Sequence, residues 1–194
     1  MTSPKKNNVN YDLMMFAGVL RSEFEKVDHA LTKGADTEYK HKFNDTAIIS
    51  GCQRGDNDIV EKLIAEGADI NHQNDMGNTA LIWAVRNQRY QAMHMLIDAG
   101  ANLNIQNHQN LTALGEAAIK GDMQATNILL NAGINAELTN RQGHNAADLA
   151  EEAGHLRIAR NIRAHIEDQY QKAFKKQQRK IGQPRQLTLK RRGS

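Results

Sequence analysis

Apolar residues recur along most of this chain at the spacing of one face of a short helix. Three stretches show it most clearly: Ile59, Val60, Leu63 and Ile64; Ala92, Met93, Leu96 and Ile97; Ala125, Ile128 and Leu129. Each follows a shorter stretch of small and apolar residues, such as ALGEAAIK (113–120), after a polar or glycine-containing break. This pattern predicts pairs of short helices, and polar stretches such as NHQNDMGN (71–78) predict projecting turns between the pairs.

Two sequence markers recur in one register with a step of 33 residues. The first is TAII at Thr46, TALI at Thr79, TALG at Thr112 and NAAD at Asn145. The second is GADT at Gly34, GADI at Gly67, GANL at Gly100 and GINA at Gly133. The threonines are suited to begin the first helix of each pair, and the glycines to end the second in a left-handed conformation. Because no pair can bury its apolar face alone, we expect the pairs to stack.

The 33-residue period, with T-A-L-x-x-A followed 18 residues later by G-A-[DN]-x-N, resembles the ankyrin repeat. The resemblance covers about residues 10–166, with a degenerate repeat at about 10–37, fuller repeats at about 41–73, 74–106 and 107–139, and a C-terminal repeat at about 140–166. The usual proline of the motif is replaced by alanine, at Ala47, Ala80 and Ala113. The usual histidine is replaced by isoleucine or glycine, at Ile49, Ile82 and Gly115. We therefore expect a stack less stable than an idealised array.

The resemblance implies an all-α ankyrin-repeat solenoid of stacked helix-turn-helix units with projecting turns. We expect a flexible N-terminus at 1–9, the repeat domain at 10–166, and a basic helical extension with a disordered tail at 167–194. In the extension, Ile158, Ile162, Ile166, Tyr170 and Phe174 follow one another at steps of four, which predicts a long amphipathic helix. Gly182 and Pro184 then predict its end.

The resemblance also implies a non-enzymatic module that binds a partner protein through its concave groove and turn tips. Trp83, the only tryptophan, is either irregular core or an aromatic anchor in that groove. The equivalent residues Ala17, Ser50, Glu116 and Leu149 vary widely in size and charge, which favours a surface position. The predicted partner-binding residues are Phe43, Met76, Asn78, Trp83, Arg86, Asn87, Arg89, Tyr90, His108, Leu111, Glu116, Lys120, Arg141 and His144.

Charge is distributed unevenly along the 194 residues, whose net charge is +3. Residues 1–166 carry 16 Lys and Arg against 20 Asp and Glu, whereas residues 167–194 carry 9 against 2. The extension therefore offers a charge patch: Lys172, Lys175, Lys176, Arg179, Lys180, Lys190, Arg191 and Arg192. The alternative function is binding of nucleic acid or an anionic surface, led by this tail. A capping helix followed by a solubilising tail is the simpler interpretation of the same residues.

Catalytic motifs are missing from the sequence. The eight histidines form neither HExxH nor a Cys/His cluster, and the lone Cys52 stands among small residues, as an inert buried thiol would. We therefore predict no enzyme, no cofactor and no metal. Without an apolar run near 18 residues or a signal peptide, we expect a cytoplasmic monomer of bacterial composition. Such a protein would serve as a regulator or inhibitor, or as an effector delivered to a host cell.

Overall fold

The computed structural model describes residues 9–181, and this part of the chain is all-helical. It contains ten α-helices and one 3₁₀ helix, with no strand among the described residues: α1 (Tyr11–Arg21), α2 (Phe24–Thr32), η1 (Lys42–Asn44), α3 (Ala47–Arg54), α4 (Asn57–Ala65), α5 (Ala80–Arg86), α6 (Tyr90–Asp98), α7 (Ala113–Lys120), α8 (Met123–Asn131), α9 (Ala146–Glu152) and α10 (Leu156–Ile181). The predicted all-α class is confirmed. The predicted N-terminal segment up to residue 8 and the predicted tail from residue 182 lie outside the described residues.

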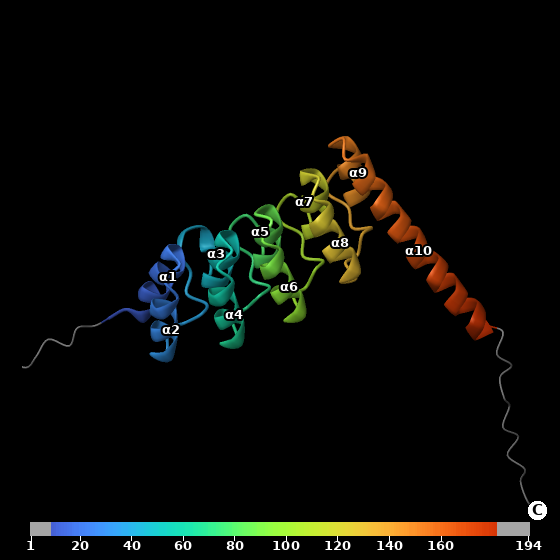
Figure 1. Ribbon diagram of the computed structural model, residues 1–194. Coiled ribbons are helices and arrows are strands. Elements are labelled where there is room, and N and C mark those ends of the chain that lie inside the picture. Colours follow the sequence, from blue (N-terminus) through green and yellow to red (C-terminus); the bar gives the residue numbers. More distant parts are fainter. Residues whose placement is uncertain (1–8, 182–194) are drawn as a thin grey trace, which may run out of the picture.

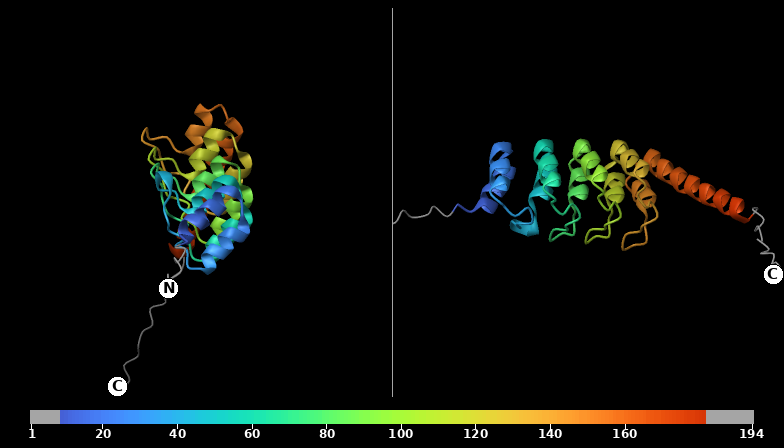
Figure 2. Two further views of the ribbon diagram at one scale, coloured as in Figure 1. Left: turned by 90° about the vertical axis from the view of Figure 1, so that its left-hand side faces the viewer. Right: turned by 90° about the horizontal axis from the view of Figure 1, so that it is seen from below.

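Successive helix pairs lie side by side in one row, from α1 and α2 at one end to α9 and α10 at the other (Figure 1). The first helices of neighbouring pairs pack together: α1 on α3, α3 on α5, α5 on α7 and α7 on α9. The segments between the pairs project on one side of the row, as the view from below shows (Figure 2). The predicted solenoid with projecting turns is therefore confirmed.

One apolar core runs the length of the stack, from Met15 in α1 to Ile162 in α10. The first helices contribute small buried residues such as Ala84 and Ala117, which let neighbouring helices approach closely. The second helices contribute larger ones such as Leu63 and its repeat equivalents. Because this core is shared between neighbours, each helix pair depends on the pairs beside it.

The start of each first helix follows the predicted marker. The hydroxyls of Thr79 and Thr112 accept hydrogen bonds from the backbone N–H groups of Ile82 and Gly115, at 3.3 Å and 3.2 Å. Asn145 caps α9 in the same way, within a reciprocal capping box with Asp148. Thr46 stands at the same position with extended backbone, but its hydroxyl makes no capping bond.

The end of each second helix explains the glycine marker. Gly67, Gly100 and Gly133 have φ values of 81°, 85° and 83°, which favour glycine. After Gly67, the N–H of Ala68 bonds back to the carbonyl of Leu63, the motif that closes a helix with a left-handed residue. The next position in this series is Ile166, and α10 continues through it to Ile181.

The last helix therefore extends beyond the stack in place of a further turn. Between repeats, the side-chain oxygens of Glu38, Asn71 and Asn104 each accept a backbone N–H from the following repeat, at 2.8–2.9 Å. Glu137 is the next acceptor in this series, and it accepts instead the hydroxyl of Tyr170 on α10. The boundary predicted between residues 166 and 167 lies inside this continuous helix.

Candidate partner-binding surface

An asparagine organises each of three projecting turns. The side-chain oxygens of Asn74, Asn107 and Asn140 each accept the backbone N–H groups two and four residues further on, at 2.9–3.0 Å. These hydrogen bonds from the asparagine side chain to the local backbone hold each turn in a tight loop. At the first of the three tips, Met76 is raised into solvent with 43% of its surface exposed.

Neighbouring turns are tied to one another. The backbone N–H of Asp75 donates to the carbonyl of Phe43 at 2.9 Å, and that of His108 donates to the carbonyl of Met76 at 3.1 Å. The side-chain amide of Gln106 donates to the carbonyl of Thr139 in the next turn at 2.8 Å. The tips therefore form a row whose spacing is set by backbone hydrogen bonds, which gives a pre-organised surface for a partner.

A first hollow of about 340 Å³ opens between two of these tips and the end of α5. It is lined by Asp75, Met76, Asn78, Arg86, Asn107, His108 and Gln109. The tip residues come from two successive turns, and Arg86 reaches them from the first helix of the pair. An apolar side chain, an arginine and several amide groups thus converge on one concave site, a mixture typical of protein-binding surfaces.

A buried polar network holds Arg86 in this hollow. Its Nη2 lies 2.5 Å from Oε1 of Glu116, whose side chain is only 9% exposed. The same oxygen accepts a hydrogen bond from Nδ2 of Asn107 at 3.1 Å, and that amide also donates to Asn78 at 3.0 Å. Burial of a carboxylate costs free energy unless a counter-charge and hydrogen bonds compensate for the lost water, and Glu116 has both. It also links two successive repeats across the floor of the hollow.

A second hollow of about 320 Å³ lies one repeat further along. It is lined by Gln109, Leu111, Ile119, Asn140, Arg141, Gln142 and Leu149. Its geometry repeats that of the first, with two turn tips on one side and first helices behind. Gln109 lines both hollows, so they form one continuous surface along the stack.

The structure brings many of the predicted partner-binding residues together. Met76, Asn78, Arg86 and His108 line the first hollow, and Leu111 and Arg141 line the second. Phe43 is 67% exposed at an earlier turn tip. Two further predicted residues support the surface: Glu116 beneath it and Lys120, whose Nζ donates to the carbonyl of Arg86 at 2.6 Å.

Other predicted residues lie elsewhere and are engaged within the chain. Asn87, Arg89 and Tyr90 stand at the break between α5 and α6, where Arg89 lies across Gly55 of the preceding repeat. The hydroxyl of Tyr90 donates to Asp122 of the next repeat at 3.0 Å. Burial and this carboxylate raise the pKa of Tyr90. His144 lies 2.8 Å from Glu152 through Nδ1.

Trp83 is half-buried and packs against the core, while the guanidinium of Arg86 lies 5.4 Å from the centre of its ring. Its indole N–H is buried without a hydrogen-bond partner among the described residues. The equivalent Ser50, Glu116 and Leu149 are buried, so the expected surface position is wrong for these three. The preceding repeat covers this position, and Ala17 is exposed because no described repeat precedes it.

Sequence reasoning missed several residues of the surface. Asn107 is buried and donates to both Asn78 and Glu116, and Ile119 lines the second hollow. The asparagine signal was available, because residues 74, 107 and 140 are all asparagine at the 33-residue step. The hollows themselves depend on which first-helix side chains face the turns, and the period alone does not give that.

Two further groups bear on catalysis or metal binding. Ligand atoms of Glu38, Asp69 and His72 lie within 4.8 Å of one another. Glu38 accepts the backbone N–H of Asp69, Asp69 accepts that of Asn71, and His72 Nε2 lies 2.9 Å from the carbonyl of Asn44, so each of the three side chains already has a hydrogen-bond partner in the chain. Cys52 is fully buried, and burial raises the pKa of its thiol. The expected buried thiol is confirmed.

Comparison with known families gives two matches. A model of ankyrin repeats in three copies matches residues 13–107, and a model of ankyrin repeats in many copies matches residues 88–130. No curated protein matches the chain. The matched region runs from α1 into α8 and contains the first hollow completely.

Proposed function

Because the chain belongs to the ankyrin-repeat family, we propose that it binds a partner protein through the row of turn tips and the two hollows. Ankyrin-repeat proteins are generally protein–protein interaction modules and are typically non-enzymatic. The observation that carries the proposal is the recurrence of one concave site in successive repeats. A partner segment lying along the tips would meet the first hollow and then the second.

The chemistry of the two hollows indicates what the partner presents. Met76 and Leu111 offer apolar contact, while Arg86 and Arg141 offer guanidinium groups. Arg141 is exposed and donates to Asn110 at 3.3 Å. Arginine and aromatic residues in half-buried settings are the common hot spots of interfaces. We therefore propose an apolar segment flanked by carboxylates as the bound part of the partner.

Affinity capture tests this proposal with the full chain as bait. Met76→Glu with Arg141→Glu would place a repelling carboxylate in each hollow without touching the core. The matched control is Gln91→Glu with Lys33→Glu, which makes the same change of charge at two exposed positions outside the hollows. We avoid Trp83→Ala, since losing a half-buried side chain packed against the core would weaken the fold itself.

We expect one protein from a bacterial or eukaryotic lysate to bind the wild type and the control, and to be lost with the hollow variant. That protein's identity would decide whether the chain is a regulator, an inhibitor or a host-directed effector. Equal capture by the hollow variant would refute the proposed surface. Turnover of a substrate by the chain alone would refute the non-enzymatic assignment.

A further inference from the structure

The second half of α10 is exposed and, after a contact through Tyr170, extends beyond the repeats. Helix α10 has 26 residues, and only its first half contributes buried side chains, namely Ile158, Ala159 and Ile162. From Glu167 to Arg179 every residue is exposed. In Figure 1 the helix leaves the end of the stack and its last turns lie well away from α8. We call residues 167–181 the arm.

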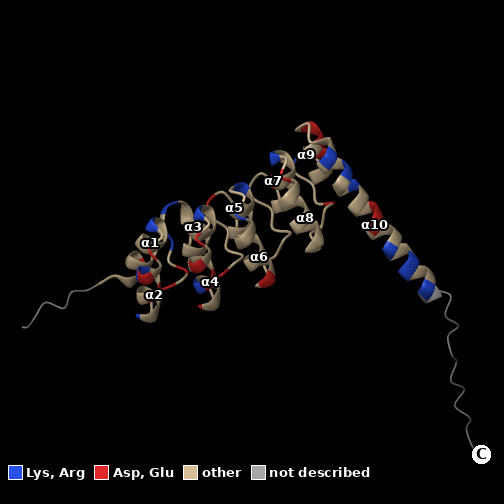
Figure 3. Ribbon diagram, viewed as in Figure 1, with Lys and Arg blue, Asp and Glu red and all other residues tan. Residues whose placement is uncertain are grey.

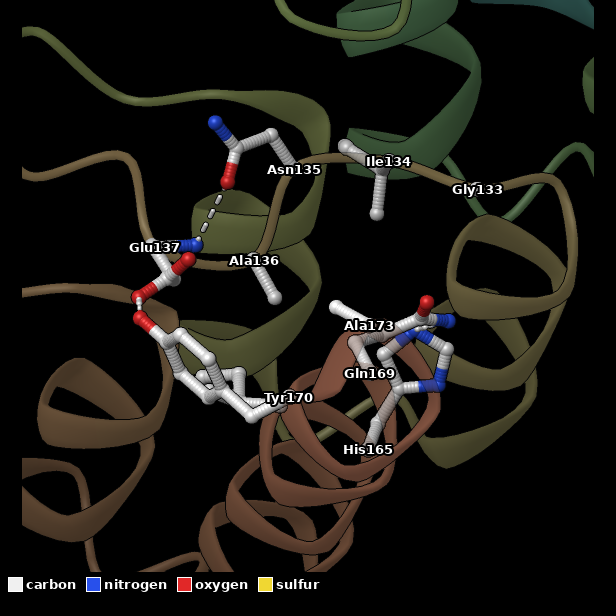
Figure 4. A pocket seen from close by; sticks show the side chains of 10 residues that line it. Gly133, Ile134, Asn135, Ala136, Glu137, His165, Gln169, Tyr170 and Ala173 are labelled. Atoms are coloured by element: carbon white, nitrogen blue, oxygen red, sulfur yellow. Dashed lines mark hydrogen bonds between the residues drawn. The ribbon is translucent and has the colours of Figure 1, made fainter. Parts of the chain in front are cut away.

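One side of the arm faces a cleft of about 410 Å³ against the segment Gly133–Glu137 (Figure 4). Tyr170 closes one side of this cleft, with its hydroxyl hydrogen-bonded to Glu137. Phe174 lies one turn further along and does not line the cleft, and 59% of its surface is exposed. The arm therefore presents a large aromatic side chain to solvent beyond the reach of the repeats.

Another side of the arm is basic. Lys172, Lys175, Lys176 and Arg179 follow the i, i+3, i+4, i+7 spacing of a single helix face. Lys172 pairs with Asp168 at 2.5 Å, whereas the other three form no ion pair within residues 9–179. Figure 3 shows this concentration of basic residues toward the end of α10.

We propose that the arm binds an anionic lipid surface. An interfacial helix needs a charged face rich in lysine and an opposite apolar face, and the arm carries its basic residues on one side and Phe174 on the other. Phe174 and Lys175 are adjacent, about 100° apart around the helix, so the ring can enter the boundary of the acyl chains while the ammonium reaches the headgroups. The remaining basic side chains lie within about one helix diameter of the surface, comparable with the screening length at physiological salt.

The charge of the whole chain supports this orientation. Residues 1–166 have more acidic than basic side chains, by 20 to 16, and residues 167–194 have more basic ones, by 9 to 2. An anionic surface therefore attracts the arm and repels the repeats. A nucleic-acid duplex would satisfy the basic face but leave the exposed Phe174 unused, and a single strand stacks successive bases on several aromatic side chains, whereas the arm has only Phe174 beyond the bonded Tyr170. A lipid surface therefore fits more of the observations.

Vesicle co-sedimentation of the full chain tests the proposal. We expect binding to phosphatidylcholine vesicles that contain about 30% phosphatidylserine, weaker binding as salt rises, and none to phosphatidylcholine alone. Lys175→Glu with Lys176→Glu should lower the binding constant at least about tenfold, and Phe174→Ser about fivefold or more. Far-UV circular dichroism would check that each variant keeps the fold.

Matched controls occupy the other end of the molecule. Lys33→Glu with Lys40→Glu makes the same change of charge at two exposed sites near the start of the stack, and Phe43→Ser removes a ring that is 67% exposed, against 59% for Phe174. Both should bind vesicles as the wild type does. The proposal fails if the controls weaken binding as much as the arm variants do, or if the wild type does not bind.

Two rival occupants give different results. If the basic residues matter and Phe174→Ser does not, and a duplex oligonucleotide binds as tightly as the vesicles, the arm is a polyanion site and the lipid proposal is overturned. If the wild type is a dimer that Phe174→Ser converts to monomers, with vesicle binding unchanged, a second copy covers the arm. Neither result bears on capture through the hollows, so the two proposals are tested independently.

Discussion

Among single residues, Cys52 makes a prediction about pH. It is fully buried on α3, and burial raises the pKa of its thiol far above the ordinary value. A raised pKa in the folded chain gives stability that is complete below the unfolded pKa of about 8.5 and is lost as pH rises beyond it. The free energy of unfolding should therefore fall above about pH 8.5, by up to about 1.4 kcal/mol per pH unit.

Urea unfolding under reducing conditions between about pH 7.5 and 9.5 would measure this slope. Tyr90, whose pKa is also raised, would titrate above that window. The control is Cys52→Ala, which removes the titrating group and should remove the slope. A slope unchanged in this variant would assign the pH dependence to another residue.

Residue-level roles were the least predictable from the sequence. The residues equivalent to Trp83 in the other repeats vary in size and charge, which predicted an exposed position, yet Ser50 and Glu116 are buried. The sequence shows the size and charge of each residue but not its partner. Glu116 tolerates burial only because Arg86 and Asn107 supply a counter-charge and a hydrogen bond, and these residues lie 30 and 9 positions away.

At the level of whole elements, the sequence was much more informative, because helix ends depend on local chemistry. Thr79 and Thr112 cap helices as predicted, and Gly67, Gly100 and Gly133 end them with left-handed backbone. The long α10 was also predicted, from apolar residues at steps of four. What the sequence did not reveal was the substitute contact by which Tyr170 completes the series of bonds between repeats.

The position of Ile166 leads to a second prediction. It is the residue that replaces the helix-ending glycine of the earlier repeats, and it packs against the core. Ile166→Gly should cost about 0.5 kcal/mol in helix propensity, in addition to the lost apolar contact, and should favour an end to the helix there. Hydrogen exchange of the backbone amides in residues 167–179 would then become faster.

The control for this change is Ile166→Ala, which loses the same contact but keeps a strong helix former. We expect its amides in the arm to exchange almost as slowly as those of the wild type. If the alanine and glycine variants exchange equally fast, the packing of Ile166, and not its backbone preference, holds the arm.

Considered as a whole molecule, the chain is a one-dimensional stack whose ends face solvent. Exposed Leu13 and Ala17 at the first repeat occupy positions that are mostly buried in the inner repeats, so burial depends on having a neighbour. The other end is closed by the first half of α10. Within residues 9–181, the helices include none that is both long and apolar enough to cross a membrane.

Truncation would separate the two roles of α10. A chain that ends at Glu167 keeps the buried Ile158, Ala159 and Ile162 and loses the exposed arm with its bond from Tyr170 to Glu137. Because that contact is exposed, the free energy of unfolding should change little. A chain that ends at Gly154 loses the three buried residues and should be destabilised by at least about 4 kcal/mol.

Urea unfolding followed by circular dichroism would compare these two chains with the full length. Against a typical stability of about 5–15 kcal/mol, a loss of about 4 kcal/mol would melt the last repeats first, because each depends on its neighbour. If the chain that ends at Glu167 loses little stability, the arm is dispensable for folding. Its basic face and exposed ring are then explained by binding. Comparable losses in both truncated chains would show instead that the arm stabilises the stack, which would remove the main reason to assign it a surface of its own.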